Sequence, residues 1–280
     1  MKVILSSFLF ARPYGESIGD MNLKESIIGR AKRLVHREQF KRALRRNQLD
    51  PAEFAHIPMD MIEMMETIRN FKRKSNVLLD IGTFKGEFSK VAQAFFQFDQ
   101  IYCFEPNADM HAQIRANNKN SNLAIQHVAL SDVSGKEVTF FMHDDASMNS
   151  TVDAEAEVLR KEFPYSNPDH IKTTRVITQT LDDFIQETRA GHQEDVYCIK
   201  LDTQGNELSI LKHGIQTLKR TEICLIEFMF TSPYKTTFSF YELIDFMKAN
   251  HFTCEGALSL RKRPSGKISS VDFLFVNTQI

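Results

Sequence analysis

The stretch from Asn76 to Ser89 constrains the fold more than any other part of the sequence. It reads Asn-Val-Leu-Leu-Asp-Ile-Gly-Thr-Phe-Lys-Gly-Glu-Phe-Ser. Val77 to Ile81 is a short, nearly all-apolar run, which is typical of a strand buried on both faces of a parallel sheet. A turn from Gly82 to Gly86 follows at once, and apolar residues then recur at helical spacing. A strand, a glycine turn and a helix in this order form the opening unit of a doubly wound nucleotide-binding domain.

Two acids near this turn indicate the class of ligand. A dinucleotide site needs three glycines as G-x-G-x-x-G, and this turn has no third glycine. Asp80 lies just before Gly82, where an acid would repel a pyrophosphate but would suit a ligand that carries an amine and a sulfonium. The next predicted strand, Gln100 to Phe104, ends in Glu105-Pro106, where an acid is placed to accept both ribose hydroxyls of an adenosine. The two acids together predict a site for S-adenosylmethionine.

The turn and four later blocks resemble one family. Asp80-Ile-Gly-Thr-Phe-Lys-Gly resembles the D-x-G-A-N-x-G turn of FkbM-type methyltransferases, with Thr83-Phe84 where the family usually has Ala-Asn. The later blocks are Phe104-Glu-Pro-Asn, Ala129-Leu-Ser-Asp-Val-Ser-Gly, Thr180-Leu-Asp-Asp-Phe and Ile199-Lys-Leu-Asp-Thr-Gln-Gly-Asn-Glu-Leu. The resemblance implies an α/β, doubly wound, Rossmann-like methyltransferase sheet with strand order 3-2-1-4-5-7-6 and a final antiparallel hairpin. It also implies that S-adenosylmethionine is the cofactor.

The expected cofactor contacts come from the turn, from the end of the second predicted strand and from the end of the third, which is expected from Leu123 to Leu130. They are Asp80, Gly82, Thr83, Phe84, Gly86, Glu105, Pro106, Ser131 and Asp132. In the family resembled, an acid at the position of Asp132 contacts the adenine amino group. Asp132 is equally suited to capping the turn toward Gly135.

Transfer of a methyl group to an oxygen requires a group that takes the acceptor's proton. Asp202 is the first candidate, because it ends a predicted strand, Val196 to Leu201, that lies beside the first one. His143 and Glu227 follow, although a histidine in a surface loop needs no chemical role. Asp202, Glu207 and Glu227 are alternatively an oxygen site for Mg²⁺, but the prediction favours a reaction without a metal.

The first 75 residues are expected to form a helical region, and residues 76–280 the methyltransferase domain. The predicted helix from Asn22 to Arg46 has a strongly basic face that suits either solvent or an anionic partner such as RNA. A second helix is expected from Met59 to Phe71, and Lys72 to Ser75 as a link to the domain. The formal net charge of −1 gives no general attraction to nucleic acid or membrane.

The four cysteines stand at wide spacings in predicted strands, which suits buried thiols in a reducing compartment. The apolar run from Val3 to Ala11 is too short to span a bilayer. The sequence thus predicts a cytoplasmic protein without a membrane partner, and a homodimer is one possible assembly.

The leading prediction is an O-methyltransferase that acts on a hydroxyl of a sugar, a polyketide or another small metabolite. An RNA methyltransferase and a non-catalytic adenosyl-ligand-binding subunit are the alternatives. The long polar stretch from His143 to Ile171 is expected to be a mobile lid that helps to shape the acceptor pocket.

Overall fold

The structure is a computed structural model, and it divides the chain into two compact units, Met1–Met59 and Asp60–Ile280. The residues it describes are 52–163, 167–189, 192–235, 238–263 and 266–280, together with Glu38, Lys41, Arg42, Leu44, Arg45 and Asp50. The run from Val3 to Ala11 and most of the predicted basic helix lie outside these residues. The second unit begins at Asp60, so the expected link from Lys72 to Ser75 lies inside it.

Within the described residues, one large sheet has the strand order β3-β2-β1-β7-β8-β10-β9. Its strands are β1 (Val77–Ile81), β2 (Gln100–Phe104), β3 (Leu123–Gln126), β7 (Tyr197–Leu201), β8 (Thr221–Met229), β9 (Phe252–Lys262) and β10 (Ile268–Asn277). β10 runs antiparallel to both β8 and β9, and the other neighbouring strands pair in parallel. Numbered along the chain, this order is 3-2-1-4-5-7-6, as the family resemblance implied.

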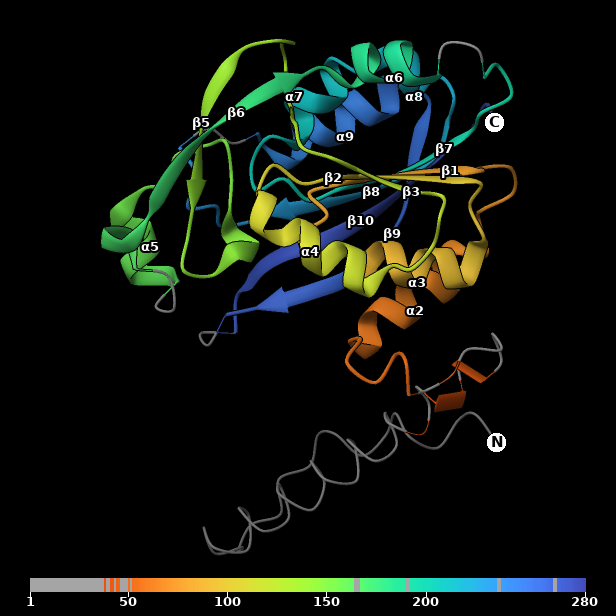
Figure 1. The fold of residues 1–280 in the computed structure, drawn as a ribbon, viewed down its shortest axis with the longest axis horizontal. Helices are drawn as coiled ribbons and strands as arrows, with labels where there is room; N and C mark the ends of the chain where they lie inside the picture. The colour runs from red at the N-terminus through yellow and green to blue at the C-terminus, as the bar shows by residue number, and fades with distance from the viewer. Residues whose placement is uncertain are drawn as a thin grey trace, which may run out of the picture. The chain divides into compact units, whose positions relative to one another are not determined.

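Helices cover both faces of the large sheet. Figure 1 shows α2 (Met59–Ile68), α3 (Glu87–Phe96) and α4 (Ala108–Asn117) on one side. The other side carries α6 (Leu181–Arg189), α7 (Glu207–Lys212), α8 (Ile215–Leu218) and α9 (Phe240–Ala249). β1 is buried along its whole length, as a central strand between two helical layers must be. Burying each Leu or Ile of such a strand contributes about 1.5–3 kcal/mol.

The prediction of one long third strand from Leu123 to Leu130 was wrong. β3 ends at Gln126, and Ala129–Leu130 form β4, which pairs with β6 (Lys172–Gln179). β6 also pairs antiparallel with β5 (Glu137–Met142). The three strands form a small sheet of order β4-β6-β5. The backbone of β4 is therefore satisfied by a strand that comes much later in the chain.

The stretch between β5 and β6 contains short helices with their own apolar cluster. They are η1 (Ala146–Met148), α5 (Ala156–Glu162) and η2 (Pro168–His170). Met148, Ala154, Leu159, Phe163 and Tyr234 pack together beneath α5. Ala154 also forms a bridge to Tyr234, so the stretch is tied to the segment after β8. Its predicted mobility stays a prediction.

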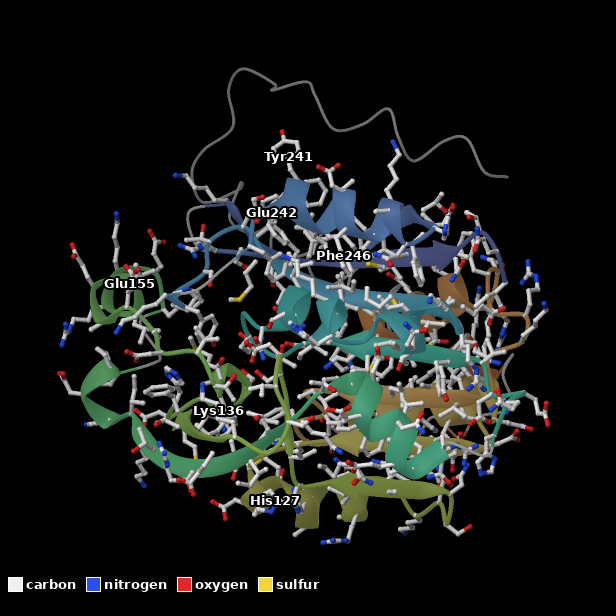
Figure 2. The ribbon with its side chains drawn as sticks, turned by 90° about the horizontal axis from the view of Figure 1, so that it is seen from above. His127, Lys136, Glu155, Tyr241, Glu242 and Phe246 are labelled. Carbon is white, nitrogen blue, oxygen red and sulfur yellow. The ribbon has the colours of Figure 1, made fainter. Side chains whose placement is uncertain are left out.

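The expectation that the cysteines are buried holds for three of the four. Cys103, Cys198 and Cys224 are buried free thiols, but Cys254, in the edge strand β9, is exposed. In Figure 2, Tyr241 points outward from α9, and it is 79% exposed. His127, which follows β3, lies at the opposite side of the same view.

Candidate active site

The turn after β1 is held mainly by backbone groups. The N–H groups of Gly82 and Thr83 both donate to the carbonyl oxygen of Phe104 at 3.1 Å, which joins the turn to the end of β2. Thr83 Oγ1 donates to the carbonyl of Asp80 at 2.6 Å, and the N–H of Gly86 donates to the carbonyl of Thr83 at 3.0 Å. Gly82, Phe84 and Gly86 all have positive φ, which glycine adopts readily and Phe84 only under constraint.

The two glycines are required by protein contacts. A Cβ on Gly82 would overlap the carbonyl of Asp202, at the end of the neighbouring strand. A Cβ on Gly86 would lie 2.6 Å from Nδ2 of Asn118. Close approach of a ligand is therefore not needed to explain either glycine, because contacts with Asp202 after β7 and with Asn118 after α4 already exclude a side chain.

Asp80 is fully buried beneath this turn. Ser89 Oγ donates to its Oδ2 at 2.6 Å, and Lys200 Nζ lies 3.8 Å from its Oδ1. Oδ1 has no hydrogen-bond partner within the described part of the chain. Burial raises the pKa of Asp80 above its usual value, although the Lys200 charge and the Ser89 hydroxyl lower it. A buried carboxyl oxygen without a donor fits a ligand that supplies one, such as an amine.

Glu105 joins the turn to the start of α4. Its Oε2 accepts the N–H of Phe84 at 2.8 Å, and its Oε1 accepts the N–H of Asn107 at 2.9 Å. Burial raises the pKa of Glu105 to about 7, although these two backbone hydrogen bonds lower it. Each carboxylate oxygen can accept a second bond, so Glu105 fits the ribose hydroxyls as well as the turn. Pro106 follows it and directs the chain into α4.

Ser131 and Asp132 lie at the end of β4, in the small sheet. The N–H of Ser131 donates to the carbonyl of Gln179 at 2.9 Å, and Ser131 Oγ donates to Oδ1 of Asp132 at 3.1 Å. Asn206 Nδ2 donates to the carbonyl of Leu130 at 3.1 Å, so this end of β4 lies beside the loop after β7. Asp132 itself is exposed.

Asp202 ends β7 beside the glycine turn, and its N–H donates to the carbonyl of Ile81 at 3.0 Å. Its side chain is 25% exposed, and Lys200 Nζ lies 3.4 Å from its Oδ2. Burial favours the neutral acid, but the Lys200 charge and further hydrogen bonds outweigh it, so the pKa of Asp202 is lowered. Lys200 was missed by sequence reasoning. The available signal was a lysine inside an otherwise apolar buried strand.

Glu227 of β8 shares one amide with Asp202. Gln204 Nε2 donates to Oδ1 of Asp202 at 2.6 Å and to Oε2 of Glu227 at 2.7 Å. Glu227 also pairs with Arg261 of β9 and lies opposite Asp272 of β10. Burial and the nearby Asp202 raise the pKa of Glu227 well above its usual value. The structure thus brings two of the three predicted proton acceptors together.

Glu207 faces its own loop, so the predicted alternative magnesium site is not assembled. Its Oε1 accepts the N–H of Thr203 at 2.7 Å, and its Oε2 accepts the N–H of Gly205 at 3.1 Å. Across the described ranges, no group of three or more His, Cys, Asp or Glu side chains is arranged to hold a metal ion.

His143 lies in a different environment. It follows β5, it is buried, and its N–H donates to Oδ1 of Asn149 at 2.9 Å. Burial lowers the pKa of His143, and the opposing charges come from Asp144, Asp145 and Asp153. Asp202 is not among them, so the electrostatic surroundings of His143 are those of its own segment.

The segment around His143 still reaches the loop after β7 through two residues that sequence reasoning missed. Ser150 Oγ donates to the carbonyl of Gln204 at 2.9 Å. Tyr234 Oη donates to the carbonyl of Met148 at 2.8 Å and lies 3.1 Å from Oε1 of Gln204. Gln204, whose φ is 60°, is therefore held at its backbone carbonyl by Ser150 and at its side-chain oxygen by Tyr234.

The sequence pattern described as the Methyltransferase FkbM domain matches residues 80–254, which is more than half of the chain. The chain belongs to the FkbM methyltransferase family. It is therefore a methyltransferase that depends on S-adenosylmethionine, and the resemblance stated from its motifs is confirmed. A comparison with curated protein sequences gives no match.

Solved structures give fold-level likenesses at low identity. One is the magnesium protoporphyrin IX methyltransferase of Synechocystis PCC 6803 with bound cofactor (9% identity, 77% of this chain, 75% of that chain, TM-score 0.41). Another is the precorrin-6y C5,15-methyltransferase of Geobacter metallireducens (12% identity, 75% and 85%, TM-score 0.37). A third is a Pyrococcus horikoshii protein described as an RNA methyltransferase (9% identity, 78% and 81%, TM-score 0.41).

The described part of this FkbM chain contains no helix long and apolar enough to cross a bilayer.

Proposed function

We propose that this FkbM methyltransferase methylates a hydroxyl oxygen of a small metabolite, such as a sugar or a polyketide, and that Asp202 accepts the proton. The observation that supports this role is the position of Asp202. It is a partly exposed carboxylate whose backbone touches the cofactor turn and whose pKa is lowered while those of its acidic neighbours are raised. An ionised carboxylate can take a proton, and the position of Asp202 beside the turn supports the role, whereas its lowered pKa makes it a weaker base than an ordinary aspartate.

The cofactor contacts expected from the sequence complete the proposal. S-adenosylmethionine, when bound, supplies an electrophilic methyl group. Asp80 and Glu105 would accept its amine and ribose donors, and the turn of Gly82, Thr83, Phe84 and Gly86 would bear on its methionine end. Pro106, Ser131 and Asp132 would face the adenosine. The acceptor's hydroxyl proton would pass to a carboxylate oxygen of Asp202 as the C–O bond to the methyl group forms and the bond from that methyl group to sulfur breaks, which would leave S-adenosylhomocysteine.

A cytoplasmic location is part of the same proposal. The buried thiols of Cys103, Cys198 and Cys224 support it, since free thiols persist where disulfides are kept reduced.

The test is methyl transfer from labelled S-adenosylmethionine by the full chain to separate pools of sugars, hydroxylated metabolites and RNA. Label in a small-molecule ether supports the proposal, whereas label in RNA alone supports the alternative. Asp202→Asn should slow transfer by about 10²–10⁴-fold, the usual effect of removing a general base. Asp245→Asn, the same change at an exposed site on α9, is the matched control. A near-normal rate for Asp202→Asn would remove Asp202 from this role.

A further inference from the structure

One buried ammonium contacts both the cofactor turn and the proposed proton acceptor. Lys200 Nζ donates to the carbonyl of Gly82 at 2.8 Å, and it lies 3.4 Å from Oδ2 of Asp202 and 3.8 Å from Oδ1 of Asp80. The parallel register of β1 and β7 sets Lys200 opposite Asp80. Its side chain is only 12% exposed, so these contacts are poorly screened by water.

Several elements place ionisable groups near enough to Asp202 to interact with its charge. The acids are Asp80 of β1, Glu207 of α7, Glu227 of β8 and Asp272 of β10, and the cations are Lys200 of β7 and Arg261 of β9. Burial raises the pKa of each of these four acids, that of Asp272 to about 6. Only Asp202 among the five acids is shifted the other way, and Lys200 provides the largest opposing effect.

We propose that Lys200 is a positioning residue of the methyl-transfer site, whose ammonium ties the Gly82 turn to Asp202 and keeps Asp202 a carboxylate. The proposal rests on the proposed function, in which Asp202 accepts the proton. Without this cation, Asp202 and Glu227, which share the amide of Gln204, would keep Arg261 as their neighbouring cation. Two carboxyl groups this close tend to share one proton. Asp202 would then be partly protonated and less able to take the proton of the acceptor's hydroxyl group.

The ionisation of Asp202 can be measured without knowing the acceptor. The full chain is labelled with ¹³Cγ-aspartate and titrated by NMR, and the Asp202 signal is identified by its loss in Asp202→Asn. In the wild-type protein we expect Asp202 to be more than half ionised at about pH 4, the ordinary midpoint of an aspartate. A wild-type Asp202 that is half ionised or less at that pH overturns the proposal, whatever the variants do.

Variants at Lys200 then show whether this residue is the cause. Lys200→Met should raise the midpoint of Asp202 by about one pH unit or more, a tenfold change in its acid constant. Lys200→Arg, which keeps the charge, should leave most of the ionisation in place. Lys235→Met removes an exposed lysine that pairs with Asp153 and should leave the Asp202 signal unchanged.

The outcomes separate this proposal from the proposed function. An unchanged Asp202 midpoint in folded Lys200→Met would mean that Lys200 only fills space. If Lys200→Met does not fold, a folded Lys200→Arg in which Asp202 becomes neutral overturns the proposal equally. If Asp202→Asn still transfers methyl groups while the Lys200 titrations behave as expected, the proposed function fails and the link between Lys200 and Asp202 stands.

Discussion

The turn Gly82–Gly86 after β1 and the loop Asp202–Asn206 after β7 follow neighbouring strands to the same edge of the sheet. Both contain residues at positive φ, and in both a buried glutamate accepts backbone N–H groups. In the first, Glu105 comes from another strand, and glycines fit where a side chain would overlap β7 or α4. In the second, Glu207 belongs to the following helix, and Lys200 and Gln204 hold the acids.

The two segments at this edge of the sheet are therefore held by different kinds of interaction. The first turn is fixed by shape, because its main constraints are backbone contacts and missing Cβ atoms. The second loop is fixed by charge, because its main constraints are ion pairs and hydrogen bonds to carboxylates. Substitutions that change shape should therefore damage the first turn more, and substitutions that change charge should damage the second.

The largest expected effect is at Gly82. Gly82→Ala would force its Cβ into the Asp202 carbonyl and would add left-handed strain, so we expect a loss of about 3 kcal/mol or more of unfolding free energy. Gly135→Ala is the matched control, since Gly135 has nearly the same φ but nothing within 4 Å of the added Cβ. It should lose only about 1–2 kcal/mol. Equal losses in urea unfolding would show that strain, and not contact with β7, constrains Gly82.

In the loop Asp202–Asn206, the substitution Glu207→Gln should lower the stability of the protein. The amide has one acceptor oxygen for the N–H groups of Thr203 and Gly205, so we expect a loss of about 1–3 kcal/mol in the unfolding free energy. Glu194→Gln, at an exposed position, should change it very little. A neutral effect at both positions would mean that the carboxylate does not hold the loop.

Glu105 should make stability depend on pH. Its pKa of about 7 in the folded chain exceeds the usual 4.5, so between these values the folded protein holds a proton that the unfolded chain has lost. The stabilisation is complete below the lower value and is lost as pH rises through about 7. Unfolding free energy should therefore fall by about 2 kcal/mol from pH 5 to pH 7, and Glu105→Gln should flatten that slope.

Glu105 also tests the cofactor site directly. Glu105→Ala should weaken binding of S-adenosylhomocysteine by about 1.5–3 kcal/mol if it bonds both ribose hydroxyls. Calorimetry on the folded variant provides the measurement, and an unchanged affinity would remove Glu105 from the cofactor site.

A smaller effect is expected at Tyr234, which links η1 to the loop Asp202–Asn206. Tyr234→Phe removes the hydroxyl that lies against Met148 and Gln204, so stability should fall by about 1 kcal/mol. Hydrogen exchange of residues 143–150 should become faster, because their link to the loop is weakened. Exchange that is equally slow in both proteins would show that the segment is held without Tyr234.

The smallest expected effect on stability is at Asp132, which is exposed. Asp132→Asn should change stability by less than about 0.5 kcal/mol. If its carboxylate accepts the adenine amino group, cofactor affinity should still fall by about 1.5–3 kcal/mol, because that hydrogen bond is charged. A loss of stability without a loss of affinity would favour the turn-capping role instead.

The sequence predicted the features that depend on neighbouring residues. The apolar run of β1 and the glycine turn after it are local patterns with direct physical causes. Family motifs then supplied the strand order, which no local pattern contains. The split of the third strand was missed, because β4 is only two residues long and its partner β6 lies more than 40 residues later.

By itself, then, the sequence determined the cofactor class and which acids stand at the ends of strands. Tertiary structure alone decided what each acid does, because a carboxyl group's charge depends on neighbours brought from other elements. Asp202 and Glu227 both stand on apolar strands, yet only the arrangement of Lys200 and Gln204 around them lowers one pKa and leaves the other raised. A lysine within a strand carries no sign of this role until the register of β1 and β7 places it between two aspartates.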